Sequence, residues 1–101
     1  MPGLNEEEMA LVTAKILMDG IREGIEGEVE DVFNFPGMKK YIDIRCTSEN
    51  GTLLMHAAKC NQYYIAKYLL EIGANKAIKD NEGKTASDYA ISHSMKRILD
   101  I

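Results

Sequence analysis

His56 and Cys60 come closest, among the residues of this chain, to a spacing that could do chemistry. They stand four residues apart in a stretch whose pattern predicts a helix, so the thiol and the imidazole would share one face. A Cys–His nucleophile also needs a group that orients the imidazole and donors that bind the oxyanion. The neighbouring residues supply neither, so we predict no enzymatic activity. A catalytic or redox role of Cys60 with His56 stays a third hypothesis.

Metal and cofactor sites are not predicted either. The possible soft metal ligands, Cys46, His56, Cys60 and His93, lack the close paired spacing of zinc sites. The chain has no glycine-rich phosphate loop of the Gly-x-Gly-x-x-Gly or Gly-x-x-x-x-Gly-Lys type. We therefore expect no metal and no cofactor, and we expect the two cysteines to be free thiols in a reducing compartment.

The composition predicts one globular domain, because the 101 residues are 46% hydrophobic and 28% charged. No apolar stretch approaches the roughly 18–20 residues that a membrane span needs. The acidic start lacks the apolar core of a secretory signal. We therefore expect a cytoplasmic protein, with the nucleus also open, that does not bind membranes.

The net charge of −4 is unevenly distributed along the chain. Residues 1–34 carry nine acidic and two basic side chains, a net charge of −7, whereas residues 35–101 carry ten basic and seven acidic ones, a net charge of +3. The acidic end argues against nucleic acid as the main ligand. It either orients a partner or is the solvated face of acidic helices, and the sequence leaves both open.

A repeat of 33 residues relates Thr52–Ala58 to Thr85–Ile91. Self-similarity at this period predicts a stack of helical repeats, whose usual function is binding. In the central unit, Leu54 and Ala58 lie on one stripe of a first helix that ends at Asn61.

A second helix of the central unit is predicted to end at Gly73, a residue suited to the left-handed turn after a helix. Thr85 and Asp88 have the spacing of a capping box, which predicts the start of the next helix at Thr85. Only one short apolar stripe follows, at Met95 and Leu99, so we expect a truncated last unit.

The first half of the chain fits the central unit at an offset of 37 residues, with apolar side chains in the same helical phase through two helices. From Asp43 onward the offset is 32, which places Gly51 opposite Gly83. The shift predicts an insert at about Phe35–Lys40 and one missing residue between Gly51 and Thr52. Insertions of this kind often serve binding.

The segment Thr52-Leu53-Leu54-Met55-His56-Ala57-Ala58 resembles the Thr-Pro-Leu-His-x-Ala-Ala motif of the ankyrin repeat family. Ile65–Asn75 is similar to the second helix and glycine turn of that repeat, and Asp80–Thr85 to the loop that opens the next unit.

The chain departs from the motif at two positions. Leu53 and Ala86 replace the proline, and Met55 and Asp88 replace the histidine. His56 stands one place later, and the sequence leaves open whether its side chain bonds internally or lies at the surface.

The resemblance implies an all-α fold, a stack of about three helix-turn-helix units with projecting finger loops. We predict a single domain over 1–101, with an N-terminal capping unit at about 5–45 that contains the insert at 34–42. A full repeat at 48–79 and a truncated C-terminal cap at 80–101 follow.

The resemblance also implies a non-enzymatic adaptor or inhibitor that binds a protein through its fingers and the face of its first helices. A second hypothesis is a structural subunit or segment of a larger ankyrin-containing assembly. Lys59, Lys79 and Lys84 would share a mildly basic surface suited to an acidic peptide or helix, and we expect a monomer when free. Phe35 and Tyr41 would either anchor the partner or fold the insert onto the core. The positions that map to partner contacts are Met38, Lys39, Lys40, Tyr41, Arg45, Thr47, Glu49, Asn50, Lys59, Cys60, Lys79, Asn81, Glu82, Lys84, Ser92 and His93.

Overall fold

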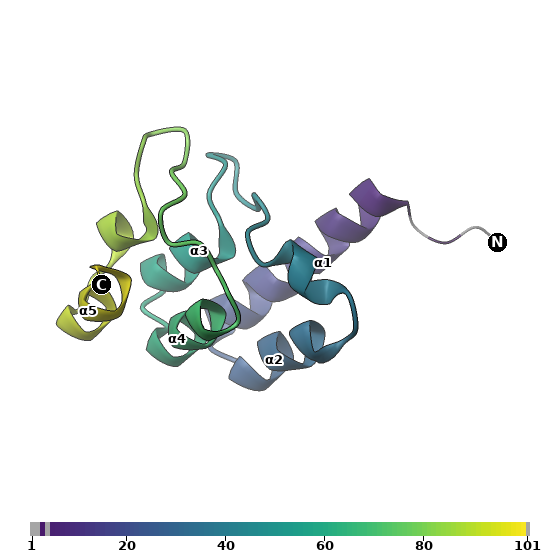
Figure 1. The fold of residues 1–101 in the computed structure, drawn as a ribbon, viewed down its shortest axis with the longest axis horizontal. Helices are drawn as coiled ribbons and strands as arrows, with labels where there is room; N and C mark the ends of the chain where they lie inside the picture. The colour runs from purple at the N-terminus through teal and green to yellow at the C-terminus, as the bar shows by residue number, and fades with distance from the viewer. Residues whose placement is uncertain (1–2, 4, 101) are drawn as a thin grey trace.

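The computed structural model describes residue 3 and residues 5–100. These residues form a row of helix pairs with two loops projecting from one side (Figure 1). The α-helices are α1 (Glu6–Glu23), α2 (Glu26–Asn34), α3 (Leu53–Lys59), α4 (Tyr63–Glu71) and α5 (His93–Asp100), and the 3-10 helices are η1 (Met38–Tyr41) and η2 (Ala86–Tyr89). The predicted all-α class is confirmed. Among the described residues, the β pairing consists of an isolated antiparallel bridge between Arg45 and Thr52.

The helices form two layers. α1, α3 and η2 lie side by side in one layer, and α2, α4 and α5 cover them in the other (Figure 1). The first finger, residues 42–52, and the second finger, residues 74–85, connect one helix pair to the next and project together from one side of the stack (Figure 1). Among the described helices, none combines the length and the hydropathy that a membrane span requires.

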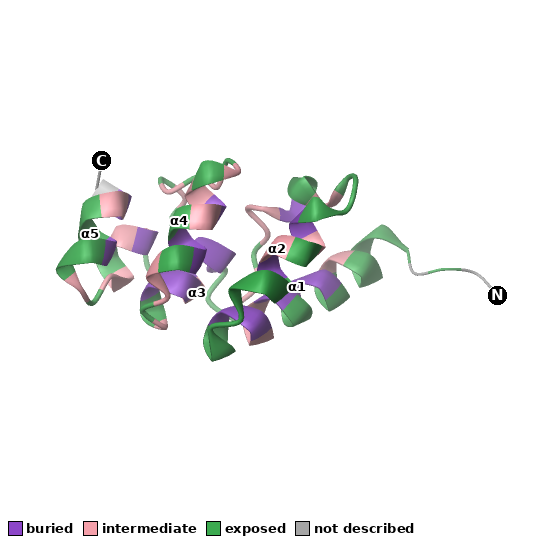
Figure 2. Ribbon diagram, turned by 90° about the horizontal axis from the view of Figure 1, so that it is seen from below, coloured by how far each residue is buried: buried purple, intermediate pink, exposed green. Residues whose placement is uncertain are grey.

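The buried residues lie between neighbouring helices, and α3 is at the centre (Figure 2). Leu54 and Ala58 of α3 pack among apolar side chains of α1, α4 and η2, and both are essentially inaccessible to solvent. Polar residues cover the outside of the central pair. The periodicity of the apolar residues therefore predicted the core of the central unit correctly.

The turn inside each helix pair has the same backbone. Gly24 ends α1 with φ 74°, and Asn61 follows α3 with φ 55°, so both residues are left-handed as their position after a helix predicts. The amide of Ile25 donates to the Gly20 carbonyl at 2.9 Å, and the amide of Gln62 donates to the Ala57 carbonyl at 2.9 Å. The offset of 37 residues predicted from the sequence is thus the spacing of equivalent hydrogen bonds.

Gly20 has a packing role in the first pair. A Cβ atom at this position would lie 3.4 Å from Cγ2 of Val29, at van der Waals contact, so there is little room for a side chain larger than a methyl group between α1 and α2.

α2 ends one residue before the insert. Phe35 is extended with ψ 136°, as expected for a residue that precedes a proline. The predicted insert is ordered as a turn followed by η1, and the ring of Tyr41 at the end of η1 is buried.

The register of the first finger corrects the sequence alignment. Asn50, with φ 61°, occupies the left-handed position that Gly83 has in the second finger, so the offset is 33 and not 32. The amide of Gly51 donates to Thr47 Oγ1 at 2.8 Å, as the amide of Lys84 donates to Asp80 Oδ1 at 3.0 Å. No residue is missing before Thr52. The glycine at 51 was misleading because asparagine also accepts the left-handed conformation.

The third unit is shorter than predicted. The amide of Thr85 donates to Asp88 Oδ2 at 2.9 Å, so the capping box exists, but it opens only the 3-10 turn η2. The chain is extended again at Ala90, and the Ser92 hydroxyl accepts the Met95 amide at the start of α5. The new helix begins so soon after Tyr89 that a full first helix has no room.

Candidate protein-binding surface

The two fingers are held together as one unit. Arg45 Nη1 donates to the carbonyl oxygen of Asn50 at 2.6 Å and to that of Lys79 at 2.7 Å, which joins the first finger to the second. The amide of Asn81 donates to the Glu49 carbonyl at 2.8 Å, and the side chains of Asn50 and Asn81 bond at 3.3 Å. Arg45, Asn50 and Asn81 were expected to contact a partner, and the structure gives each a role in joining the fingers. A joined pair of loops presents a preorganised surface.

At the base of the second finger, a tyrosine links two predicted contact residues. The ammonium of Lys59 lies 4.4 Å from the centre of the Tyr89 ring, and the ammonium of Lys84 lies 5.5 Å from it. The Tyr89 hydroxyl donates to Asp80, whose side chain also accepts the amides of Glu82 and Lys84. This cluster connects α3, the second finger and η2.

Hydrogen bonding sets the ionisation of this cluster. The Tyr89 hydroxyl, with the two backbone amides, holds the pKa of Asp80 below its ordinary value. The same hydrogen bond to Asp80 raises the pKa of Tyr89 to about 12. Both groups therefore keep the bond through the neutral range, and the finger base stays closed there.

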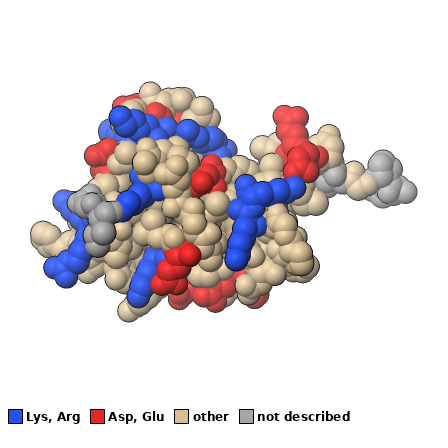
Figure 3. Space-filling view, in the orientation of Figure 1, with Lys and Arg blue, Asp and Glu red and all other residues tan. Residues whose placement is uncertain are grey.

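The expected basic surface exists but is interrupted by acids. Lys59, Lys79 and Lys84 are exposed, and Figure 3 shows basic atoms over the finger loops. Lys84 pairs with Glu82 at 3.4 Å, and Glu49 is exposed on the first finger. The basic excess of this face is therefore small.

The insert does not extend the finger surface. Lys40 pairs with Glu6 at 2.5 Å, and the Tyr41 hydroxyl donates to the same carboxylate at 3.2 Å, so both side chains are bound to the start of α1. The pair lowers the pKa of Glu6 and raises that of Lys40. The sequence left open whether Tyr41 anchors a partner or folds the insert onto the core, and the burial of its ring favours the second alternative. Phe35, by contrast, is 69% exposed.

The remaining predicted positions divide between caps and open surface. Ser92 accepts an amide at the start of α5, and Thr47 accepts the Gly51 amide inside the first finger, so both serve the backbone. Lys39 and His93 are exposed, whereas Met38 is half-buried in the insert.

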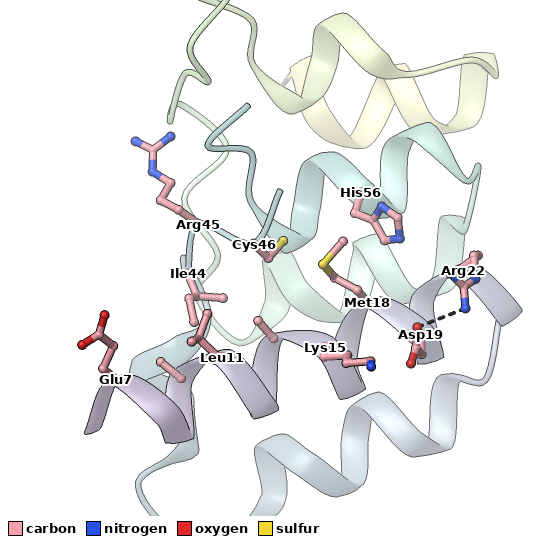
Figure 4. Close-up of a pocket in the computed structure, with 12 residues that line it drawn as sticks. Glu7, Leu11, Lys15, Met18, Asp19, Arg22, Ile44, Arg45, Cys46 and His56 are labelled. Atoms are coloured by element: carbon pink, nitrogen blue, oxygen red, sulfur yellow. Dashed lines mark hydrogen bonds and ion pairs between the residues drawn. The ribbon is translucent and has the colours of Figure 1, made fainter. Parts of the chain in front are cut away.

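A groove of about 460 Å³ lies between α1, α3 and the first finger, and we name it the α1–α3 groove. Cys46, Met18 and His56 point into the same space (Figure 4). Leu11 and Ile44 add apolar surface at its other end. Charged side chains line its edges: Glu7, Lys15, Asp19, Arg22 and Arg45. Apart from Arg45, none of these lining residues was predicted as a contact. The sequence did contain a pattern that could have predicted this groove: Leu11 and Met18 are two turns apart on α1 and so share one side of that helix.

The possible chemistry around His56 is weak. Its Nε2 lies 3.9 Å from Cys60 Sγ, so the predicted proximity of thiol and imidazole is observed. Burial lowers the pKa of His56, and burial raises the pKa of the Cys46 thiol to about 11. The Cys46 thiol therefore stays protonated at neutral pH, and a protonated thiol is a poor nucleophile and a poor metal ligand. Within the described part of the chain, no three His, Cys, Asp or Glu side chains converge as metal ligands.

Stacked helix pairs, a left-handed residue after α1 and after α3, and joined finger loops define a helical repeat protein. The family model for ankyrin repeats in three copies matches residues 13–101, and the chain belongs to this family. Ankyrin repeats are in general protein–protein interaction modules.

A putative ankyrin repeat protein of Coxiella burnetii (strain RSA 493 / Nine Mile phase I) is similar to part of the chain. The two sequences are 43% identical over 53 residues, which are 52% of this chain and 16% of the Coxiella protein.

Proposed function

We propose that this chain is a non-enzymatic adaptor or inhibitor that binds one protein partner through its fingers and the α1–α3 groove. The observation that carries the proposal is the joining of the two fingers by Arg45 and by the Asn81–Glu49 backbone bond. This arrangement keeps Lys59, Lys79 and Lys84 in fixed relation to the groove, so a partner can bind without first ordering the loops.

The partner we propose is an acidic peptide or helix with apolar anchors. Exposed ion pairs contribute only about 0–1 kcal/mol each, so the lysines alone would give little affinity. The apolar floor of the α1–α3 groove, with Leu11, Met18 and Ile44, supplies the anchoring surface. The lysines then select the orientation and the charge of the partner.

Capture of a partner from the cell of origin tests the proposal, with purified Lys79→Glu/Lys84→Glu protein as the main variant. Lys67→Glu/Lys96→Glu, on α4 and α5, is the matched control because it changes the net charge equally at two exposed lysines outside the fingers. Circular dichroism must show that both variants are folded. We expect the finger variant to lose the partner and the control to keep it. Equal retention by both variants would contradict a finger-face site.

The location that we propose for this module is the cytoplasm, with the nucleus as the alternative. Cys46 and Cys60 are free thiols, as a reducing compartment requires.

A Leu11→Gln variant tests the contribution of the α1–α3 groove. If this variant binds the captured partner with unchanged affinity, the groove is not part of the site and only the fingers remain.

The structural-subunit hypothesis is retained as the second candidate because the α1 end of the stack carries exposed apolar side chains, among them Val12 and Ile16. A docked subunit would co-purify with the larger assembly in a fixed ratio, and the Lys79→Glu/Lys84→Glu variant would still co-purify with it. Size-exclusion chromatography with light scattering distinguishes this outcome from a finger-bound partner.

A further inference from the structure

The outward face of the first helix pair is apolar. Met9, Val12 and Ile16 follow one another along α1 at helical spacing, and they are 38%, 44% and 45% exposed. Phe35, after the end of α2, is 69% exposed on the same side of the molecule. Exposed apolar residues that stand singly need no explanation, but a contiguous set marks an interaction surface.

These side chains line a second groove of about 260 Å³, which we name the end groove. Its apolar lining comes from three elements: Met9, Val12 and Ile16 of α1, Val32 of α2, and Phe35 and Met38 of the insert. The groove runs along α1, so its shape suits a helix laid beside α1, where a further unit of the stack would lie.

The other end of the stack differs in character. His93, Lys96 and Arg97 of α5 are exposed. Of its apolar residues, Met95 and Leu99 are buried and Ile98 is half-buried, and one exposed apolar residue, Ile91 at 66%, precedes the helix. A polar outer face is what the terminal unit of a repeat protein needs in water. The α5 end satisfies this requirement and the α1 end does not, so the α1 end is the one that is open to a partner.

The charges around the end groove are acidic. Asp31 lines the groove, and the Glu28 carboxylate lies beside Gly20, with an oxygen 3.6 Å from where a Cβ of Gly20 would stand. α2 contains no Lys or Arg, and the two basic residues of α1, Lys15 and Arg22, line the α1–α3 groove instead. On the insert, Lys40 is paired with Glu6, and Lys39 is the remaining basic side chain near this face.

This charge selects among the possible occupants. A second copy that presented the same face would bring a second set of acidic side chains to this groove, with no basic excess to balance them, which is unfavourable. A second copy that presented its α5 end would offer exposed polar side chains to an apolar groove. A helix with an apolar stripe and basic flanks fits both the lining and the rim.

We propose that the end groove is a docking site for an amphipathic helix of a partner protein, with apolar residues at i, i+3 or i+4 and i+7 and with Lys or Arg on both flanks. This site is separate from the fingers and does not depend on the function proposed for them. Three apolar anchors would replace water over Val12, Ile16 and Phe35.

Fluorescence anisotropy with designed peptides tests the proposal on the full chain. One labelled amphipathic peptide carries leucines at the stated spacing and lysine flanks, and its matched control carries glutamate flanks. We expect the lysine peptide to bind at least about tenfold more tightly, and we expect this advantage to shrink as ionic strength rises.

Two kinds of variant locate the site. Ile16→Gln and Phe35→Ser should each weaken the binding of the lysine peptide about tenfold, since each removes apolar surface that the bound peptide would cover. Leu11→Gln is the control, because Leu11 is also exposed and apolar, at 67%, but lines the α1–α3 groove. Glu28→Lys/Asp31→Lys should reverse the preference in favour of the glutamate peptide.

The proposal is overturned if neither peptide binds, if the flanking charge makes no difference to the affinity, or if Leu11→Gln weakens binding as much as Ile16→Gln.

Sedimentation equilibrium of the free chain provides a further check. A dimer of the free chain that Ile16→Gln dissociates would show that a second copy occupies the groove instead. Lys79→Glu/Lys84→Glu should bind the lysine peptide normally, which separates this site from the finger surface.

Discussion

The two complete helix pairs, α1–α2 and α3–α4, share a backbone but not an environment. Ile25 and Gln62, which begin the second helices, have φ/ψ of −90°/83° and −92°/83°. The central pair nevertheless lies between α1 with α2 on one side and η2 with α5 on the other. Among the described residues, the first pair contacts another helix pair on one side and otherwise packs against the short helix η1 of the insert. The local turn chemistry thus determines the shape of a pair, and its neighbours determine which of its apolar side chains are buried.

The difference has a direct consequence for α1. Its apolar residues on the α3 side, Leu17 and Ile21, are completely buried, whereas Val12 and Ile16 remain exposed. α1 is also longer than α3, with 18 residues against seven, so it carries apolar surface beyond the part that α3 covers. Stability should therefore be concentrated in the central pair, and binding surface in the first.

The largest expected effect is a core truncation in the central pair. Leu69→Ala should cost about 2–5 kcal/mol, because Leu69 is fully buried, whereas Ile16→Ala should change stability by about 0.5 kcal/mol or less. A stack of about three units is near the lower limit for this architecture, so Leu69→Ala is expected to be largely unfolded. Urea denaturation followed by circular dichroism measures both changes. Equal effects would remove the distinction between the pairs.

The next largest effect concerns the turn that the two pairs share. Gly24→Ala should destabilise by about 1–2 kcal/mol, because Gly24 has φ 74° and a Cβ atom would lie 3.0 Å from Gln62 Nε2. Asn61→Gly, at the equivalent position with φ 55°, should change stability much less, because asparagine and glycine both accept the left-handed conformation after a helix. The same denaturation measurement applies. A Gly24→Ala protein as stable as the wild type would show that the first pair tolerates a different turn.

A smaller effect is expected from the link between the fingers. Arg45→Ala should cost about 0.5–1.5 kcal/mol, since the hydrogen bonds to the Asn50 and Lys79 carbonyls are partly solvated. The amide of Asn81, which bonds to the Glu49 carbonyl, should then exchange with deuterium faster. Arg97→Ala on α5 is the control. Unchanged exchange at Asn81 in Arg45→Ala would mean that the fingers hold together without the arginine.

The smallest expected effect depends on pH. Tyr89→Phe removes the bond to Asp80, so the wild type should be the more stable protein at neutral pH. The folded state raises the pKa of Tyr89 from 10.0 to about 12, so this advantage is complete below pH 10 and is lost as the pH rises toward 12. It is also lost in acid, as the pH falls through the lowered pKa of Asp80. Denaturation midpoints across this range measure the difference. A difference that did not vary with pH would contradict the Asp80–Tyr89 bond.

The predictable parts of the fold have local causes. Thr52 and Thr85 start helical segments because their hydroxyls and the side chains three residues later satisfy the first amides. Met55 and Asp88, which stand where the motif has histidine, follow the same rule. Met55 Sδ accepts a hydrogen bond from the Thr52 amide at 3.5 Å, and Asp88 Oδ2 accepts one from the Thr85 amide. His56 lies beyond this position, half-buried against Cys60.

The candidate site was less predictable. The loop at Asp80–Thr85 was predicted and is observed, but the predicted register of the first finger was wrong by one residue. The bonds that join the fingers depend on Arg45 reaching a carbonyl 34 residues away. Lys40 was predicted as a partner contact, and it is paired with Glu6, also 34 residues away. Pairings between residues so far apart leave no trace in local sequence patterns. The predicted unit boundaries and the predicted partner contacts stay predictions.

The sequence by itself determined the ankyrin repeat, the helical class and the left-handed turns after the first helices, because apolar period, caps and turn residues act within a few positions of the chain. Only the tertiary structure decided that Tyr41 is buried while Phe35 is exposed, that η2 is a single turn, and that α1 leaves one apolar side open. Burial depends on which helix packs against which, and that is settled by the assembly of the whole stack and not by any one segment.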